Sequence, residues 1–263
     1  MLNIIVCIKQ VVDPEAPPST FKIDPDAKRA IPPAGVPPVL NPYDENAMEA
    51  ALRIKDLHQC RITAISMGAK LAKAVVRKSL AAGADELVLL EDAAFQEVDS
   101  YSTAFILAAA IEKIGKYHLI LTGRQAADTN AGVVGSGIAE ILGIPSITLA
   151  KNVEIIEGRL RVERVLPDGY EVVAAPLPVL VTVSHELGQL RNISLRELMV
   201  AQKKPIGTWT AHDLELQPSD MRRAKMLRLY IVQKEARCEI VRGKTEEEAA
   251  VNLALRLRDA KIL

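Results

Sequence analysis

One stretch limits the possible folds of this chain more than any other feature. It is a short apolar run followed by a glycine-rich loop and then by a helix. The stretch covers residues 119–145, LILTGRQAADTNAGVVGSGIAEILGIP. Residues 118–121 predict a short strand, and the chain breaks at Gly123. The apolar spacing over residues 133–142 predicts a helix, which Gly143 ends.

A strand that passes into a helix through such a loop presents free backbone N–H groups at the start of the helix. Together with the positive end of the helix dipole, these groups attract an anion, most often a phosphate. Gly132, Gly135 and Gly137 carry no Cβ and let a ligand approach the backbone closely. Their spacing, G-x-x-G-x-G, matches neither the dinucleotide fingerprint nor a P-loop. A plain strand-to-helix turn that carries glycines therefore stays an equal alternative.

Composition excludes several classes of function. The chain has 263 residues, of which 49% are hydrophobic and 25% charged, with 33 basic and 33 acidic side chains. A balanced charge and 3% aromatic residues give no support for nucleic-acid binding. No apolar run has the length of a membrane span, and residues 1–8 enter a strand without the layout of a signal peptide. We therefore expect a soluble, cytoplasmic protein.

Side chains that commonly carry catalysis or bind metals show no recognisable pattern. Cys7, Cys60 and Cys238 are scattered, and the four histidines lie far apart. The chain has no GxSxG or HExxH motif and no Cys–His pattern. We expect no metal site and no catalytic residue of its own, so that any chemistry would belong to a bound cofactor.

Apolar strands alternate with helical segments along the first half of the chain. Strands are predicted at residues 2–8, 61–67, 86–90 and 118–121, and helices at 45–57, 69–82 and 99–115. This alternation predicts an α/β fold with a doubly wound, mostly parallel sheet. In such sheets ligands bind beyond the carboxyl ends of the strands. Four segments should converge there: residues 7–10, 66–68, the stretch before Asp99, and 123–130.

The second half of the chain has a different pattern. Strict alternation and turn signals predict an antiparallel appendage at about residues 147–175, and residues 179–183 form a further apolar strand. Proline-rich stretches earlier, at 14–20 and 31–38, frame a small ribbon around Phe21–Ile23. We expect a nucleotide-binding domain over residues 1–184.

Residues 185–263 are expected to form a partner-recognition loop and a long C-terminal arm. The arm is irregular and polar until a final helix over 245–261, which a capping box at Thr245 and Glu248 opens. Such an arm either wraps a partner or packs on its own domain.

Polar residues just before the glycines have two interpretations each. Asp128, Thr129 and Asn130 are ordinary helix-capping types. A carboxylate beside a phosphate is unfavourable, so Asp128 suits a loop amide or a ribose hydroxyl better. Arg124 either pairs with a phosphate or lies solvated in the loop.

Several motifs, in order along the chain, resemble the beta subunit of electron-transfer flavoproteins. They are IIVCIKQVVD, LNPYDENAMEAALRIKD, AISMG, SLAAGADELVLL, GRQAADTNAGVVGSGIAEILGIP and ISLRELMVAQKKP. The resemblance covers essentially the whole chain. It implies a sheet of the adenine-nucleotide-binding type and a heterodimer whose alpha subunit holds a redox FAD.

The resemblance also implies which residues serve the family's functions. The residue that inserts into a partner dehydrogenase, of the acyl-CoA dehydrogenase type or another, corresponds to Leu195, for which a core contact is the alternative. The expected nucleotide contacts are Cys7, Asn41, Pro42, Tyr43, Asp44, Met67, Arg124, Gln125, Ala126, Ala127, Asp128, Thr129, Asn130, Ala131, Gly132, Val133, Val134 and Gly135.

The family has two branches, which differ in the nucleotide of the beta subunit. One branch binds AMP and shuttles single electrons. The other binds a second FAD and bifurcates electrons from NADH, one to a high-potential acceptor and one to ferredoxin or flavodoxin. Arg124, the NPYD segment and the hydroxyl-rich Asp99, Ser100, Tyr101, Ser102 and Thr103 resemble the second branch, so we expect FAD.

The chain departs from the family's sequence pattern at one position, and two other classes of protein remain as alternatives. Where the family commonly has glutamine, this chain has Val133. A nucleotide-binding regulator that resembles universal stress proteins would have a similar sheet, but it has no need of Leu195 and the long arm. An adenylating enzyme would carry a pyrophosphate loop such as SGGxDS, and residues 9–12 do not resemble one.

Overall fold

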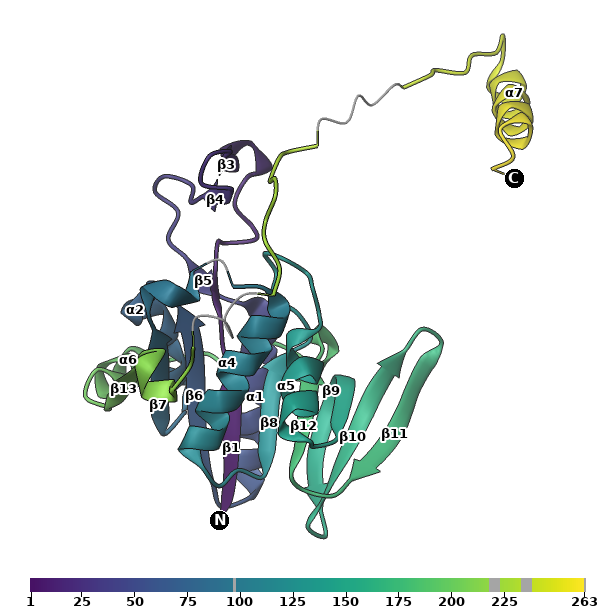
Figure 1. The fold of residues 1–263 in the computed structure, drawn as a ribbon. Helices are drawn as coiled ribbons and strands as arrows, with labels where there is room; N and C mark the ends of the chain where they lie inside the picture. Colours follow the sequence, from purple (N-terminus) through teal and green to yellow (C-terminus); the bar gives the residue numbers. More distant parts are fainter. Residues whose placement is uncertain (97, 218–222, 233–237, 263) are drawn as a thin grey trace. The chain divides into compact units, whose positions relative to one another are not determined.

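The computed structural model describes residues 1–96, 98–217, 223–232 and 238–262. The chain divides into two compact units, Met1–Leu227 and Arg228–Leu263. The first unit is built around a nine-stranded sheet of order β11-β10-β9-β12-β8-β1-β6-β7-β13 (Figure 1). Its strands are β1 (Leu2–Cys7), β6 (Cys60–Gly68), β7 (Glu86–Glu91), β8 (Leu119–Gly123), β9 (Ser146–Ile156), β10 (Arg159–Leu166), β11 (Gly169–Ala175), β12 (Val179–Val183) and β13 (Ile206–Trp209).

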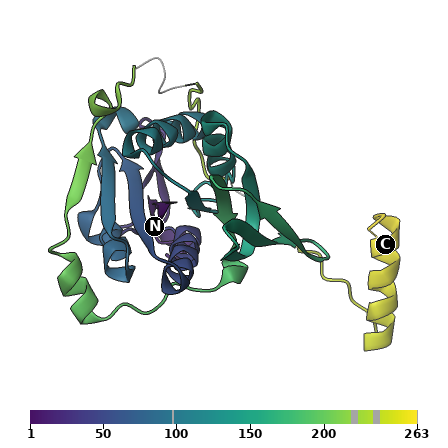
Figure 2. The ribbon, with the colours of Figure 1, turned by 90° about the horizontal axis from the view of Figure 1, so that it is seen from below.

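Helices cover both faces of this sheet, as the view from below in Figure 2 shows. The helices of the first unit are α1 (Pro42–Leu57), α2 (Lys73–Val76), α3 (Lys78–Ala82), α4 (Ser100–Ile114), α5 (Val134–Leu142) and α6 (Leu195–Ala201). One buried cluster joins the sheet to α1 and α3, and a second joins it to α4 and α5. The prediction of a doubly wound, mostly parallel α/β sheet is therefore confirmed.

The order of the strands reverses at β1. The chain runs from β1 outward through β6 and β7, then returns to add β8 on the other side of β1, and all of these neighbours pair in parallel. The connection before β6 packs α1 on one face, and the connection before β8 packs α4 on the other. A switch point therefore lies between the carboxyl ends of β1 and β8, where such sheets bind ligands.

The predicted antiparallel appendage forms β9, β10 and β11. Both of its pairings are antiparallel, while the start of β9 pairs in parallel with β12. Glu157 and Gly158 have φ values of 50° and 76°, the left-handed conformation that a tight hairpin turn requires. The predicted ribbon also forms, as β3 (Lys22–Asp24) paired with β4 (Arg29–Ile31), and the short strands β2 (Gln10–Val11) and β5 (Val39–Leu40) pair at its base.

Two segments differ from the expectation. The helix predicted over 69–82 starts only at Lys73, because the side chains of Glu91 and Gln10 accept the backbone N–H groups of Leu71 and Ala72 and hold that stretch extended. The chain after His185, expected to be irregular, forms α6 and then β13, which extends the large sheet by pairing in parallel with β7.

The second unit contains α7 (Glu246–Asp259). Thr245 accepts the N–H of Glu248 and caps the helix, as predicted. The other half of the predicted capping box differs, because the Glu248 carboxylate accepts the N–H of Lys244 and not that of Thr245. No side chain of α7 is buried. In the described part of the chain, no helix combines the length and apolar character needed to cross a membrane.

We predict that Gly123→Ala destabilises the protein by about 1–3 kcal/mol, because overpacked sites cost that much. An added Cβ would lie 2.5 Å from Oδ1 of Asp44 and 2.6 Å from the carbonyl carbon of Tyr43. Gly207→Ala is the matched control, since its Cβ would meet only Val88, at 4.0 Å. Urea unfolding of both variants checks the prediction, and equal midpoints would contradict it.

Candidate functional site

A cavity of about 690 Å³ lies at the switch point. It is formed where the carboxyl ends of β1, β6, β7 and β8 meet the starts of α1, α4 and α5, so the predicted convergence of the four strand ends occurs. Its lining residues are Cys7, Ile8, Lys9, Gln10, Arg29, Asn41, Asp44, Met67, Gly68, Ala69, Lys70, Leu71, Ala93, Phe95, Gln96, Val98, Ser100, Thr103, Leu107, Thr122, Gly123, Arg124, Gln125, Ala126, Thr129, Ala131, Gly132, Val134 and Gly135.

The charges around the cavity favour an anion. Lys9, Arg29, Lys70 and Arg124 line it, and among the described lining residues the one carboxyl group is that of Asp44. The start of α5 adds partial positive charge, because Val133 at its N-cap makes no side-chain hydrogen bond to the free N–H groups. An anionic ligand would therefore be attracted by both side chains and backbone.

Asp44 joins the ends of two strands to the start of α1. Its carboxylate accepts the backbone N–H of Lys9 at 2.8 Å, just after β1, and that of Gly123 at 3.0 Å, at the end of β8. Burial raises the pKa of Asp44 to about 7, although these hydrogen bonds and the charge of Lys9 favour the ionised form. Burial likewise raises the pKa of the neighbouring Cys7 thiol to about 12, which makes it a weak nucleophile.

The polar loop after β8 is held by two side chains, one at the N-cap of α1 and one just after β1. The Asn41 amide donates to the carbonyl of Gln125 at 2.8 Å and accepts the N–H of Ala127 at 3.0 Å. Asp128 forms an ion pair with Lys9 at 2.7 Å. The carboxylate is therefore used in a contact within the protein.

Arg124 points from the end of β8 toward the cavity. Its guanidinium lies 5.0 Å from the centre of the Tyr43 ring, a cation–π distance. Its Nε is buried, and no group of the described residues accepts a hydrogen bond from it. A buried donor without an acceptor is costly, and an anion in the cavity would supply one.

The residues of the hydroxyl-rich segment at the start of α4 have two different roles. Asp99 caps the helix by accepting the N–H of Ser102 at 2.8 Å, and the buried Ser102 hydroxyl also donates to Asp99 at 2.9 Å. Ser100 and Thr103 line the cavity instead. The second oxygen of Asp99 accepts backbone N–H groups from Arg223 and Ala224, at 2.9 and 2.6 Å.

The expected nucleotide contacts fall into two groups. Those that line the cavity are Cys7, Asn41, Asp44, Met67, Ser100, Thr103, Arg124, Gln125, Ala126, Thr129, Ala131, Gly132, Val134 and Gly135. Those that do not line it are Pro42, Tyr43, Asp99, Ser102, Ala127, Asp128, Asn130 and Val133. Leu195 lies apart from the cavity, at the start of α6, where it is 80% exposed.

Two of the three glycines also have a packing role that the sequence did not indicate. A Cβ on Gly135 would lie 2.7 Å from the side chains of both Thr122 and Thr182, and one on Gly137 would lie 3.0 Å from Ala104. These positions therefore let α5 pack against the sheet and against α4. Gly132 has a φ of 67°, and a Cβ there would meet only the carbonyl oxygen of Arg124, at 3.6 Å, so its role lies in the turn of the loop.

Sequence reasoning placed the stretch before Asp99 at the site without naming its residues, and it missed Arg29 and Leu107. Arg29 comes from the β3–β4 ribbon, and Phe95 from a short 3-10 turn after β7. Val98 and Leu107 complete the apolar wall. The position of Phe95 beyond a strand end was a usable signal, but Arg29 lies in a proline-rich excursion that has no pattern of its own.

The fold and the cavity define a doubly wound α/β protein with an anion-attracting site at the switch point, the arrangement that nucleotide-binding proteins share. A family model, the electron transfer flavoprotein domain, matches residues 31–214. Relatives support the match over greater lengths. Electron transfer flavoprotein subunit beta of Thermoanaerobacterium thermosaccharolyticum is 40% identical over the full length of both chains. The same subunit of Clostridium acetobutylicum is 41% identical and covers 84% of this chain and 83% of the relative.

A third relative, subunit CarD of the caffeyl-CoA reductase–Etf complex of Acetobacterium woodii, is 37% identical over the full length of both chains. This chain therefore belongs to the electron transfer flavoprotein family, among its beta subunits. The resemblance seen in the sequence motifs is confirmed.

We predict that Asp44 makes the protein less stable as the pH rises from about 4 to about 7. The unfolded carboxyl titrates near 4, whereas the folded one titrates at about 7. Between these values the folded state holds a proton that the unfolded state lacks, so the free energy of unfolding falls as the pH rises, by up to about 4 kcal/mol. Glu49 and Asp56, whose pKa values are lowered, act in the opposite sense but at more acidic pH.

Urea unfolding at pH 5.5 and pH 7.5 measures this effect. Asp44→Asn is the control, because it removes the titrating group whatever its cost in absolute stability. The unaltered protein should lose more stability than the variant between the two pH values. The same change in both proteins would show that Asp44 titrates outside this range.

Proposed function

We propose that this chain is the beta subunit of a heterodimeric electron transfer flavoprotein of the bifurcating branch, with FAD in the cavity described above. The observation that carries the proposal is the lining of the cavity of about 690 Å³. Arg124 and the start of α5 would suit a phosphate group. The same lining includes the apolar side chains Phe95, Val98 and Leu107, which would suit a flat ring system.

The residues of the chain would hold and shield the cofactor. The N–H groups at the start of α5, the guanidinium of Arg124 and the hydroxyls of Ser100 and Thr103 would bind the diphosphate. The apolar wall would exclude water from the ring. When bound, FAD would supply the redox chemistry by accepting and donating electrons, and no side chain is needed as an acid, base or nucleophile.

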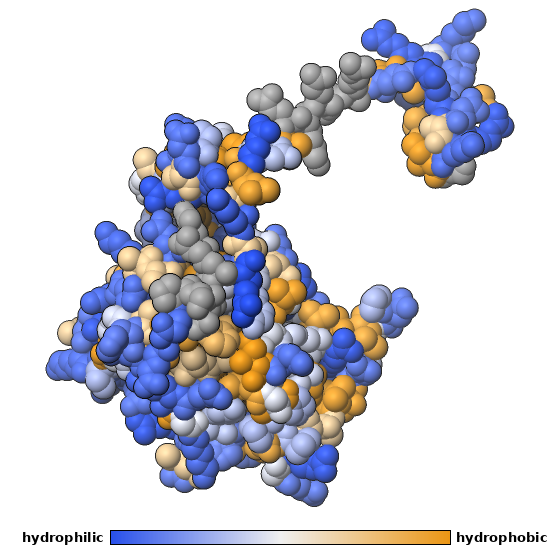
Figure 3. Space-filling view, viewed as in Figure 1, coloured by the Kyte–Doolittle hydropathy of each residue, from blue (hydrophilic) through white to orange (hydrophobic). Residues whose placement is uncertain are grey.

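The partners follow from the family and from the relative's name. We propose an alpha subunit with its own FAD, NADH as the electron donor, ferredoxin or flavodoxin as one acceptor, and a dehydrogenase as another. The CarD relative belongs to a complex with a CoA-ester reductase, which supports a dehydrogenase of the acyl-CoA type. Figure 3 displays apolar surface over strands β9–β11, where Tyr170 and Val172 are exposed, and such a surface fits a protein partner.

We also propose that α6 contacts the dehydrogenase. Its apolar side chains Leu195, Leu198, Met199 and Val200 are all exposed, and only Ala201 is buried. A short helix that turns its large apolar residues to solvent is poorly explained by packing within the chain. It fits a small apolar anchor in a protein interface.

The nucleotide content tests the cofactor. We predict that the chain, purified with its alpha subunit and denatured, releases two FAD and no AMP per heterodimer. That result would justify testing whether NADH reduces ferredoxin. One FAD and one AMP would identify the simple electron shuttle, the alternative within the family, and would overturn our assignment of the apolar wall.

We predict that Leu195→Ala raises the KM for the dehydrogenase about ten-fold while the nucleotide content stays the same, since loss of a central apolar anchor costs about 1–2 kcal/mol. Leu57→Ala is the matched control, because Leu57 is the same residue type and is 78% exposed at the end of α1. Steady-state electron transfer from NADH through the heterodimer to an acyl-CoA dehydrogenase measures both variants. Equal KM values would remove Leu195 from the interface.

A further inference from the structure

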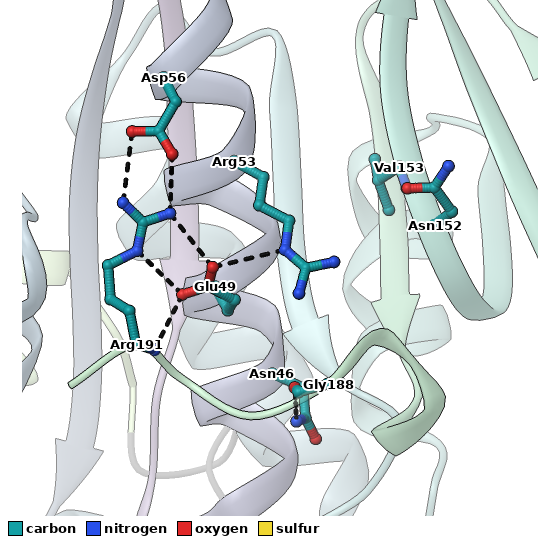
Figure 4. A network of polar contacts seen from close by, with 8 residues as sticks. All are labelled: Asn46, Glu49, Arg53, Asp56, Asn152, Val153, Gly188 and Arg191. Atoms are coloured by element: carbon teal, nitrogen blue, oxygen red, sulfur yellow. Dashed lines mark hydrogen bonds and ion pairs between the residues drawn. The ribbon is translucent and has the colours of Figure 1, made fainter.

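One arginine, Arg191, attaches the segment before α6 to helix α1. The guanidinium of Arg191 contacts two carboxylates of α1, as Figure 4 shows. It donates to Glu49 from Nε and Nη2, both at 3.1 Å, and to Asp56 from Nη2 at 2.8 Å and Nη1 at 3.3 Å. The backbone N–H of Arg191 also donates to Glu49, at 3.0 Å. Side chain and backbone of this residue are therefore fixed on one helix face.

Because Glu49 is buried, its carboxylate depends on the ion pair with Arg191. The Glu49 side chain is 8% exposed, and a carboxylate at that depth is costly unless it is paired. Burial raises the pKa of Glu49, the hydrogen bonds from Arg191 lower it, and the net shift is downward. Arg53, one turn along α1, donates to Glu49 only at 3.4 Å and is the weaker partner. The ionised Glu49 thus depends chiefly on Arg191.

A second contact fixes the same segment closer to the cavity. The Asn46 amide, which is buried in α1, donates to the carbonyl of Gly188 at 2.6 Å. Asn46 lies two residues after Asp44, which binds the ends of β1 and β8 at the cavity wall. One helix therefore carries the cavity wall in its first turn and the segment 188–191 on its flank.

Leu195 follows four residues after Arg191. Ile193 packs against the buried core, and Ser194 caps α6 in a capping box with Glu197. These contacts leave the side chain of Leu195 exposed at a defined position. A fixed segment lowers the entropy that is lost when an interface forms.

We propose that Arg191 is a positioning residue for transfer of electrons to the dehydrogenase. The clamp formed by Arg191, Glu49 and Asp56 holds the segment before α6 so that Leu195 meets the partner already ordered. Arg191 itself does not touch the cofactor or the reacting atoms. The proposal rests on the proposed role of α6 in partner recognition.

The test compares variants of the complete heterodimer. Arg191→Met removes the clamp, and Arg191→Lys keeps the charge but loses the forked geometry that reaches both carboxylates. Arg61→Met is the matched control, because it also removes an arginine from an ion pair, with Glu86, on the surface. The double variant Glu49→Gln with Arg191→Met removes the buried unpaired charge that the single variant would leave.

Four measurements separate positioning from general stability. They are the KM and kcat for electron transfer from NADH through the heterodimer to an acyl-CoA dehydrogenase, the nucleotide content, stability toward urea, and hydrogen exchange over residues 188–194. We expect Arg191→Met to raise KM at least five-fold, to change kcat less than two-fold, to keep the nucleotides and to speed exchange. Arg191→Lys should fall between it and the unaltered protein. The double variant should regain stability toward urea but keep the raised KM.

Other outcomes overturn the proposal in distinguishable ways. If Leu195→Ala raises KM and Arg191→Met does not, the clamp is not a positioning device. If the double variant regains the original KM, the effect came from the orphaned charge of Glu49. If Leu195→Ala itself leaves KM unchanged, α6 is not the docking site, and the proposed partner role fails together with this inference.

Discussion

The carboxylate of Asp44 is the contact on which the arrangement of the site depends. It accepts one backbone N–H from the end of β1 and one from the end of β8, and it does so from the first turn of α1. The three elements that border the switch point are thereby joined at one buried group. Gly123 is part of the same arrangement, because a Cβ there would occupy the space of the carboxylate.

Much of the fold followed from the sequence because it is built from long, regular patterns. The buried strands β1, β6, β7 and β8 are mostly apolar runs, and α1 and α4 have clear apolar faces. The family motifs were specific because several occurred in the same order. Strand β13 was missed because its four residues include a glycine and follow a proline, so no alternation was visible.

The site was predictable only where a local pattern marked it. The loop from Arg124 to Gly135 and the strand ends carried such patterns, whereas Arg29 reaches the cavity from a proline-rich excursion. The clamp on Arg191 could not be inferred at all, since Glu49 and Arg191 are 142 residues apart and each is an ordinary surface residue type. The packing roles of Gly135 and Gly137 were not foreseen, because a missing Cβ serves a ligand and a neighbouring element equally well.

The exposure of the α7 side chains has a consequence for the free chain. None of its side chains is buried, and Val251, Leu253 and Leu255 are exposed on a helix of 14 residues, a length that is marginal without packing. Without packing from elsewhere, these apolar side chains would be open to chaperones and proteases.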